Sequence, residues 1–511
     1  MFCTRLMSLF FALWLGLAVA ARGQQDKPGQ VEITVREKTD DPPVACRVHL
    51  KDGTGKPFKH PRLPYWFDHF VCPGTESFGL YPGSFSIEIE RGPEYETYSE
   101  KFGMEPGATK KIAVVLKRLV DMPAEGWWPG ELHVHRPVGE IESLMRAEDL
   151  HIAPVITWWN NRNEWAKKDP PVNPLVKFDG NRYYHVMAGE DEREGGALLY
   201  FHLDKPLAIT GASREFPSPM KFVEEARKHK GVWIDMEKPF WWDVPAWVAS
   251  GQVDSIGIAN NHMCRDRMYE NEAWGKPRIV DRLPAPLGNG YWTQEIYYRL
   301  LNCGLRIPPS AGSASGVLPN PVGYNRVYVH VGKELTWEKW WEGLRAGRSF
   351  VTNGPLLRVR AGGELPGHVF TAAAGKEIEV DITAELTSRD KIRFLEIIKD
   401  GEVERKVAFE DFARMGKLGT LKFKSSGWFL VRAIADNDKT FRFASTAPYY
   451  VEIGDAKRRI SKSSAKFFLD WSRERAARVK LDESNQRREV LKYHEASEKF
   501  WRDLEEKANA E

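Results

Sequence analysis

Two histidines lie two residues apart in one short segment: Gly126-Trp-Trp-Pro-Gly-Glu-Leu-His-Val-His135. Side chains alternate between the two faces of a β-strand, so the imidazoles of His133 and His135 are expected on the same face. Neutral imidazole is the side chain that transition metals bind most often. The spacing therefore predicts that the two histidines share a metal ion, and ordinary core packing of a His-x-His pair is the alternative.

Helical and strand patterns alternate around this segment, between residues 121 and 355. Patterns typical of helices cover 140–150, 219–229 and 292–302, and apolar runs typical of strands cover 152–157, 231–235 and 255–259. Such alternation favours an α/β fold, either layered or closed into a barrel. We therefore expect residues 121–355 to form a central α/β domain.

The sequence on both sides of this region has the alternating pattern that is typical of β-strands. Short alternating runs lie at 31–35, 44–50, 85–90 and 112–116 before it, and at 377–382, 392–398 and 428–434 after it. These patterns predict one β-sandwich over residues 28–120 and another over 356–455. In the tail, residues 456–511, apolar side chains recur at helical intervals among balanced charges, which favours helices packed on the body.

The composition limits the classes of function. A chain of 511 residues is too long for one core, and its 42% apolar content is typical of globular proteins. The net charge of +3 provides no field that would attract a polyanion. We therefore expect no nucleic acid among the partners.

The N-terminus has the features of a secretory signal. Arg5 precedes an apolar run that ends at Ala20, and Ala18-Val19-Ala20 fits the small-residue cleavage rule. We predict a signal peptide over residues 1–20, cleavage near Ala20, and a secreted or periplasmic protein without stable membrane insertion. A retained signal anchor is the alternative. In an oxidising compartment, Cys46 and Cys72 could form a disulfide.

Several motifs of the central region resemble the PHP family of metal-dependent hydrolases, in its CehA/McbA-like branch. The opening motif of that family reads Gly-Asp-Leu-His-Val-His, and residues 130–135 match it with Glu131 in place of the aspartate. Met187-Ala-Gly-Glu190 resembles the family's strand that ends in a metal-bridging glutamate. Segments 305–316 and 347–355 resemble the last ligand motif and the closing segment. The resemblance implies a distorted β/α barrel over 121–355, flanked by the two β-sandwiches and followed by the helical tail.

The sequence departs from the family at three ligand motifs. Thr157-Trp-Trp-Asn160 stands where the family has Thr-Asp-His-Asn, Gly195-Gly196 lacks the usual histidine, and Ala314-Ser-Gly316 replaces the final Asp-x-His. A site with three metal ions is therefore not expected. The family ligands that the chain retains, for one ion or two, are His133, His135 and Glu190.

A further ligand is expected from His262. This residue follows the apolar run 255–259 and so lies at the carboxyl end of a predicted strand, where sites of α/β barrels gather. The weaker candidates are His202, Asp191, Asp235 and Glu237. Two or three histidines with one carboxylate are a recurring ligand set of catalytic zinc. The expected cofactor is a divalent ion, zinc or manganese.

Other residues are assigned roles around this ion. Glu131 is the candidate catalytic carboxylate that orients a ligand imidazole, and Arg136 is the candidate contact for an anionic group of the substrate. Tryptophan is concentrated in the same region, since 14 of the 19 lie between residues 127 and 341. Trp158 and Trp159 stand where the family has ligands, so we predict that they bind substrate together with Asn160. Core packing of these tryptophans is the alternative.

Taken with the resemblance, these residues predict a secreted metal-dependent hydrolase of an ester, phosphoester or amide bond that uses metal-activated water. Its expected partner is a small-molecule or glycan substrate. The alternative is a catalytically degenerate binding module of the same fold, whose tryptophan-rich cleft holds a glycan or peptide without cleaving it. A purely structural envelope protein has no supporting feature in the sequence.

Overall fold

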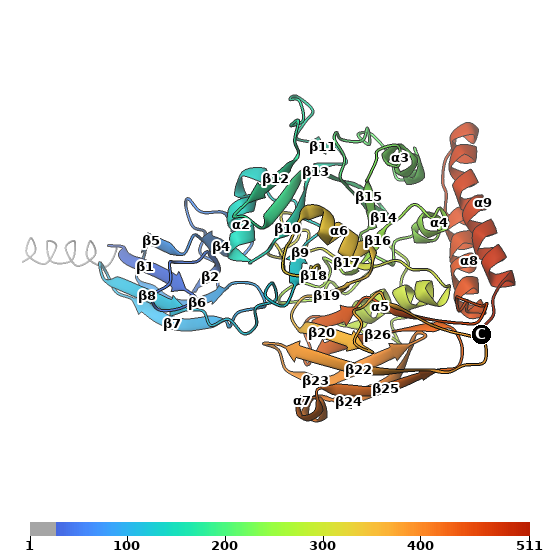
Figure 1. Cartoon of the computed structure of the whole chain (residues 1–511). Coiled ribbons are helices and arrows are strands. Elements are labelled where there is room, and N and C mark those ends of the chain that lie inside the picture. The colour runs from blue at the N-terminus through green and yellow to red at the C-terminus, as the bar shows by residue number, and fades with distance from the viewer. Residues whose placement is uncertain (1–26) are drawn as a thin grey trace, which may run out of the picture. The chain divides into compact units, whose positions relative to one another are not determined.

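The computed structural model describes residues 27–511, which form two compact units (Figure 1). The first unit contains the described residues up to Val120 together with Glu142–Asp149, and the second contains Asp121–Ile141 and Leu150–Glu511. The predicted signal peptide lies outside the described residues and stays a prediction. Within residues 27–511, none of the helices is long and apolar enough to cross a membrane.

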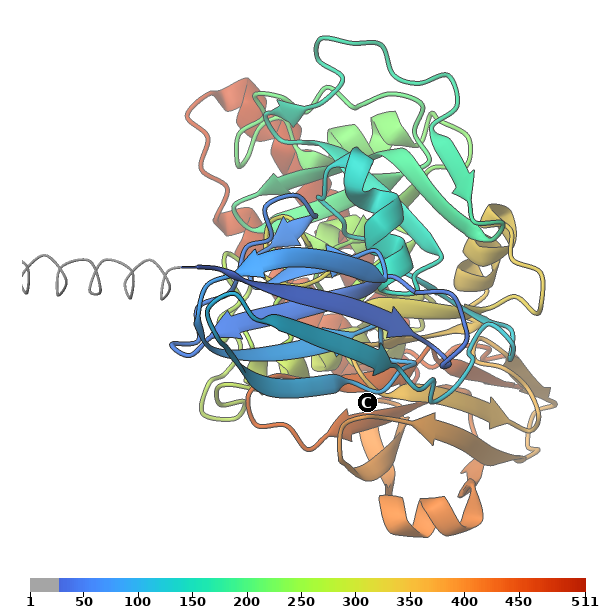
Figure 2. The same ribbon diagram turned by 90° about the vertical axis from the view of Figure 1, so that its left-hand side faces the viewer.

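The first unit consists of two β-sheets that enclose an apolar core (Figure 2, blue). Its strands are β1 Gly29–Arg36, β2 Cys46–Asp52, β3 Tyr65–Trp66, β4 His69–Cys72, β5 Thr75–Leu80, β6 Gly83–Glu90, β7 Tyr98–Met104 and β8 Thr109–Val115. The sheets have the orders β5-β1-β8 and β3-β4-β2-β6-β7. Val31, Ile33 and Val35 of β1 enter the core, as the alternating sequence pattern predicts.

Cys46 and Cys72 are direct cross-strand partners in β2 and β4. Both side chains are fully buried. Their mutual hydrogen bond, followed by burial, raises the pKa of the Cys46 thiol. Opposed residues of antiparallel strands have Cα atoms about 4.5–5.5 Å apart, which a disulfide accepts. The geometry fits the predicted disulfide, which stays a prediction because the structure has both residues as thiols.

A charged cluster is buried on the other face of the five-stranded sheet, opposite the core. Arg47 of β2 forms ion pairs with Glu90 of β6 and with Glu148 of the segment Glu142–Asp149. The side chains of all three residues are at most 7% exposed. Burial alone would lower the pKa of Arg47, but the two carboxylates outweigh it and raise the pKa. The buried positive charge of Arg47 therefore compensates the buried negative charges of Glu90 and Glu148.

The second unit is built around one large strand system. Its strands are β9 Trp127–Gly130, β10 Ile152–Trp159, β11 Arg162–Asn163, β12 Leu175–Phe178, β13 Arg182–Arg193, β14 Gly196–Phe201, β15 Trp233–Met236, β16 Ser255–Ala259, β17 Pro309–Ala311, β18 Arg326–His330, β19 Ser349–Thr352, β20 Leu356–Ala361, β21 Val369–Ala372, β22 Ile378–Thr387, β23 Ile392–Lys399, β24 Glu402–Ala408, β25 Lys417–Phe423, β26 Gly427–Ala435, β27 Phe443–Thr446 and β28 Tyr449–Ile453. Three of them form a separate sheet in the order β20-β22-β25, and the other 17 are linked into one closed system.

Helices lie between and after these strands. They are the 3-10 helix η1 Val138–Glu140 and the α-helices α2 Ile141–Ala147, α3 Pro219–Ala226, α4 Val244–Ala249, α5 Gly288–Asn302, α6 Trp337–Arg345, α7 Phe409–Met415, α8 Lys462–Ala477 and α9 Ser484–Glu506. Across residues 27–511, 28 strands accompany eight α-helices, so β-structure predominates.

The prediction of a β/α barrel over 121–355 between two separate β-sandwiches is wrong. Such a barrel consists of parallel strands joined through helices, whereas β13, β14 and β15 are antiparallel neighbours. In addition, β9 pairs antiparallel with β18, and β19 pairs antiparallel with β27, so the strand system continues past residue 355. Periodicity indicates the type of an element and not its pairing partner, which is the physical reason for the error.

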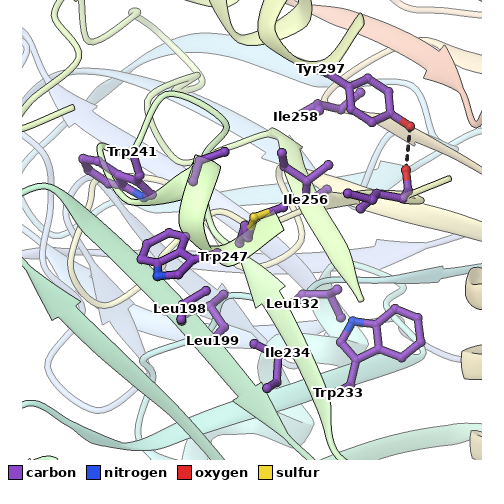
Figure 3. Close-up of a cluster of buried hydrophobic side chains, with 14 of the residues drawn as sticks. Leu132, Leu198, Leu199, Trp233, Ile234, Trp241, Trp247, Ile256, Ile258 and Tyr297 are labelled. Atoms are coloured by element: carbon purple, nitrogen blue, oxygen red, sulfur yellow. Dashed lines mark hydrogen bonds between the residues drawn. The ribbon is translucent and has the colours of Figure 1, made fainter. Parts of the chain in front are cut away.

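Many buried apolar side chains of the second unit form one large core (Figure 3). Leu132 packs there with Trp233 and other side chains of the surrounding strands. The tail helices belong to the same core, because Phe468 of α8 stacks on Trp501 of α9 at 4.7 Å. Trp501 Nε1 also donates to Pro245 O of α4 at 3.0 Å. The core thus joins the tail helices to the strand system of the second unit.

Candidate metal centre

Residues 131–135 follow β9 and are held by backbone hydrogen bonds on the side of β17. Leu132 N donates to Ala311 O at 3.0 Å, and His135 N donates to Ser315 O at 2.8 Å. The apolar side chain of Leu132 enters the core, so alternation directs the imidazoles to the other side. A Cβ atom at position 312 would lie 2.3 Å from His133 Cβ, and glycine at this position therefore permits the close approach.

His133, His135 and Glu190 bring their ligand atoms within 4.8 Å of one another. The two Nε2 atoms lie 2.9 Å apart, and Glu190 Oε2 lies 3.0 Å from His135 Nε2 and 3.5 Å from His133 Nε2. The three side chains are at most 7% exposed. Glu190 reaches the histidines because β13 pairs with β10, where Trp159 is the register partner of Glu190. The three predicted family ligands therefore converge.

Glu237, directly after β15, orients His133. Its Oε1 atom lies 3.3 Å from His133 Nδ1. When His133 donates the Nδ1 proton to this carboxylate, the lone pair of Nε2 faces His135 and Glu190. Glu237 is therefore placed to set the tautomer of His133.

Three buried neighbours hold Glu237 in turn. Asn261 Nδ2 donates to Oε1 at 2.7 Å, and Trp241 Nε1 donates to Oε2 at 3.1 Å. Lys238 Nζ lies 2.6 Å from Oε2 and balances the charge of this carboxylate. The negative charge of Glu190 then faces the two imidazoles, which are neutral when they bind a metal.

The donor atoms present fit a divalent metal ion. Glu190 Oε2 is buried and accepts no hydrogen bond from the described residues, although two imidazole nitrogens lie within 3.5 Å. Two Nε2 lone pairs 2.9 Å apart repel each other unless they share a proton or a metal ion. Two imidazole nitrogens and one carboxylate oxygen are ligands that zinc and manganese accept.

Burial and the neighbouring charges also shift the pKa values of His133, His135 and Glu190. Burial would lower the pKa of His133, but Glu190 and Glu237 outweigh it and raise the pKa. Burial lowers the pKa of His135. It would raise the pKa of Glu190, but the two histidines lower that pKa. A proton and a metal ion thus compete for the same lone pairs.

His262, the predicted further ligand, is not part of the cluster. Among the described residues, the ligand atoms that lie within 4.8 Å of one another in this region are those of His133, His135 and Glu190. Asn260 Oδ1 accepts from His262 N at 3.1 Å and turns the chain after β16. The ring then packs 5.6 Å from that of Phe240, and burial lowers the pKa of His262 to about 3.

Glu131 and Arg136 have partners other than those expected. Glu131 accepts hydrogen bonds from the backbone N–H groups of Ser313, at 2.6 Å, and of Gly323. It therefore holds the loop after β17, and the carboxylate that lies beside a ring nitrogen of His133 is that of Glu237. Burial raises the pKa of Glu131 to about 7. Arg136 forms an ion pair with Glu140.

Of the three residues predicted to bind substrate, Trp159 contacts the cluster. Its ring lies 4.7 Å from that of His135, and its Nε1 donates to Glu192 Oε2 at 3.1 Å. Trp158 is 2% exposed and packs in the core. Asn160 Oδ1 accepts from Glu192 N at 2.9 Å, so this side chain shapes the turn after β10.

The weaker candidate ligands other than Glu237 belong to separate hydrogen-bond networks. His202 Nδ1 contacts Gly231 O at 3.0 Å, and Asp191 pairs with Arg193 at 2.7 Å. Asp235 accepts from the hydroxyl groups of two serines, Ser255 and Ser310. Glu237 had a signal in the sequence, because it follows the apolar run predicted as a strand at 231–235.

A second histidine cluster, in the first unit, has a different pattern. His49 Nδ1 and His69 Nδ1 each lie 3.1 Å from a carboxylate oxygen of Asp68. Arg47 Nε donates to His49 Nε2 at 3.0 Å, which requires the proton of the neutral imidazole to be on Nδ1. That nitrogen then donates to Asp68 and is not available to a metal. This cluster is therefore a hydrogen-bond chain.

Comparison with known proteins does not identify a family for this chain. No family model matches the chain, and no curated protein matches it. Among solved structures, it is similar to the N-terminal four Ig domains of Dscam1 isoform 8.4, with 8% identity and a TM-score of 0.15. Isoform 6.9 gives 10% identity and a TM-score of 0.14. Both alignments cover 84% of this chain and 73% of the other, and such low TM-scores carry no argument.

Proposed function

We propose that this protein is a metal-dependent hydrolase whose ion is held by His133, His135 and Glu190. One observation carries the proposal: three buried donor atoms converge within 4.8 Å, and Glu237 directs His133 Nε2 toward the other two. Three protein ligands leave positions for water and substrate, as in catalytic zinc sites. A bound zinc or manganese ion would lower the pKa of a coordinated water and polarise the scissile ester, phosphoester or amide.

The position of the cluster in the strand system supports this proposal. Strands β15, β16 and β17 are parallel neighbours. Glu237 follows β15, and Gly312, which lies against His133, follows β17. Because neighbouring parallel strands run in the same direction, their carboxyl ends lie at one edge of the strand system, and both residues lie there. The indole of Trp159 lies against the imidazole of His135, with 4.7 Å between the ring centroids.

We also propose that the protein acts outside the cytoplasm. The supporting observation is the sequence of residues 1–20, in which an apolar run ends in Ala18-Val19-Ala20. Intact-mass measurement of the exported protein tests this proposal. A mature chain that begins near Ala21 would support it, and a chain that retains Met1 would contradict it.

The test of hydrolase activity is metal-dependent turnover. Purified protein is assayed with chromogenic carboxylic esters, phosphate mono- and diesters and amides, first as isolated, then after chelation, and then after zinc or manganese is restored. Turnover that disappears with the chelator and returns with the ion supports the proposal. Failure of the metal-loaded protein to cleave any of these substrates would contradict it.

Glu237→Gln is expected to weaken zinc binding by about 10- to 100-fold, because loss of the charge at His133 Nδ1 lowers the basicity of Nε2. Competition with a chromophoric chelator measures the Kd. The matched control is Glu452→Gln, which removes the ion pair with Arg306 elsewhere in the second unit and should bind zinc like the wild type. Equal zinc affinity of Glu237→Gln and the wild type would show that Glu237 does not orient the ligand.

A further inference from the structure

A polar cavity of about 540 Å³ lies apart from the candidate metal centre. It is lined by residues of α5, by the first residues of α8 and by the turn at Asp400-Gly401. Two tyrosines of α5, Tyr291 and Tyr298, are part of the lining. The volume is within the range of pockets that bind small molecules, about 300–1,000 Å³.

The four arginines that line this cavity have carboxylate partners, and Arg459 lies 3.9 Å from Asp400. Glu295 forms ion pairs with Arg282 at 2.6 Å and with Arg299 at 2.9 Å. Arg432 pairs with Glu396 at 2.8 Å. Because these guanidinium groups have carboxylate partners, the lining does not favour an anion. It favours a neutral ligand with many hydroxyl groups, since a hydroxyl group can both donate to a carboxylate and accept from a cation.

Gln294 is an independent sign of a ligand. Its Oε1 accepts from the Tyr298 hydroxyl at 3.0 Å and from Arg432 Nη1. Because a guanidinium group can only donate, this contact determines which amide atom faces Arg432. Gln294 is 1% exposed and lines the cavity, and its Nε2 has no acceptor among residues 27–511. A hydroxyl oxygen of a ligand would satisfy this buried donor.

Two further cavities continue from the first. One of about 380 Å³ shares Tyr291 with it, and one of about 740 Å³ shares Arg393 and Phe394 with the second. Phe394 is 39% exposed, and Phe409, which lines the third cavity, is 36% exposed. In the second cavity, Arg393 lies 2.7 Å from Asp436, and Lys406 lies 3.3 Å from Glu396. Aromatic side chains thus recur along three adjoining cavities.

We propose that these three cavities form one groove that binds a neutral polysaccharide chain. Tyr291, Phe394 and Phe409 stack on successive sugar rings, and Gln294 Nε2 donates to a hydroxyl oxygen. Paired arginines and carboxylates exchange hydrogen bonds with the remaining hydroxyl groups. The groove does not depend on the metal centre, so it would hold the protein on a glycan whether or not the metal is bound.

Affinity electrophoresis tests the groove. The full chain is run through native gels that contain soluble xylan, glucomannan or mixed-linkage glucan, and through gels that contain alginate or polygalacturonate. We expect retardation by at least one of the neutral polysaccharides, unchanged after metal removal with a chelator. Absence of retardation in every neutral gel, or retardation by the acidic polymers alone, would overturn the proposal.

Substitution of two exposed aromatic residues tests whether the polysaccharide binds in this groove. Phe394→Ala combined with Phe409→Ala removes two exposed rings and should weaken retardation by about tenfold, the size of a lost stacking contact. Tyr81→Ala is the control, because Tyr81 is a 69% exposed aromatic residue of the first unit. Unchanged binding of the double variant would place the glycan elsewhere and overturn the proposal.

Gln294→Glu is the isosteric test of the buried donor. It keeps an acceptor for Tyr298 and Arg432 and replaces the unpartnered amide nitrogen by an oxygen, so it should weaken retardation by about tenfold as well. If thermal unfolding shows that this variant is not folded, the phenylalanine variant decides alone. A folded Gln294→Glu protein that binds like the wild type would contradict the role of Gln294.

Discussion

Replacing His133 and His135 together with alanine is expected to reduce bound zinc or manganese from about one equivalent per chain to below about a tenth. The structure leaves Glu190 as the remaining ligand of the cluster, and a single carboxylate does not hold a transition metal tightly. Elemental analysis by mass spectrometry of the purified protein measures the content. Hydrolytic turnover should be lost with the metal.

The control for this experiment is a second pair of histidines. His229→Ala combined with His368→Ala removes two imidazoles that are not part of the cluster, and this protein should retain the metal content of the wild type. Metal that persists in the His133/His135 variant would place the ion elsewhere. A metal-free wild type would exclude the proposed metal-dependent hydrolase and favour a binding function for the same residues.

Arg47→Met is expected to lower the free energy of unfolding of the first unit by about 3–5 kcal/mol, because it leaves the carboxylates of Glu90 and Glu148 buried without their compensating charge. Urea denaturation followed by circular dichroism measures the loss as a shift of the transition midpoint. Among possible substitutions in this unit, removal of a buried charge shared by two carboxylates should have one of the largest effects.

An exposed arginine of the same unit provides the comparison. Arg62 pairs with Glu76 at 3.0 Å, but its side chain is 72% exposed. Arg62→Met should therefore lower the stability by less than about 1 kcal/mol, as is usual for surface ion pairs. Equal effects of the two substitutions would show that the charges around Arg47 are hydrated and that burial does not determine their contribution.

The types of many elements could be predicted from the sequence, because alternation and helical spacing are local properties. Strand β10 includes the predicted run 152–157, β16 covers 255–259, and α5 includes the predicted 292–302. The arrangement of these elements could not be predicted in the same way. The apolar run of β14 is compatible with parallel or antiparallel neighbours, and its antiparallel pairing with β13 and β15 is what excludes a β/α barrel.

In the candidate site, too, local sequence spacing predicts some features, whereas others depend on contacts that this spacing does not reveal. Spacing alone places His133 and His135 on one face, and the resemblance adds Glu190. Glu131 is turned toward the backbone N–H groups of residues 313 and 323, and Glu237 lies beside His133 instead. His262 lies outside the cluster, because a hydrogen bond from its own backbone to Asn260 turns the chain directly after the strand. Neither contact can be deduced from strand periodicity.

The packing of the tail has a consequence for the order of folding. Trp128 at the start of the second unit and Trp501 in α9 belong to one apolar core. Ribosomal synthesis therefore exposes the early strands long before the helix that completes their core exists. Domains normally fold as units during or after synthesis, and this unit cannot be completed until Trp501 has left the ribosome.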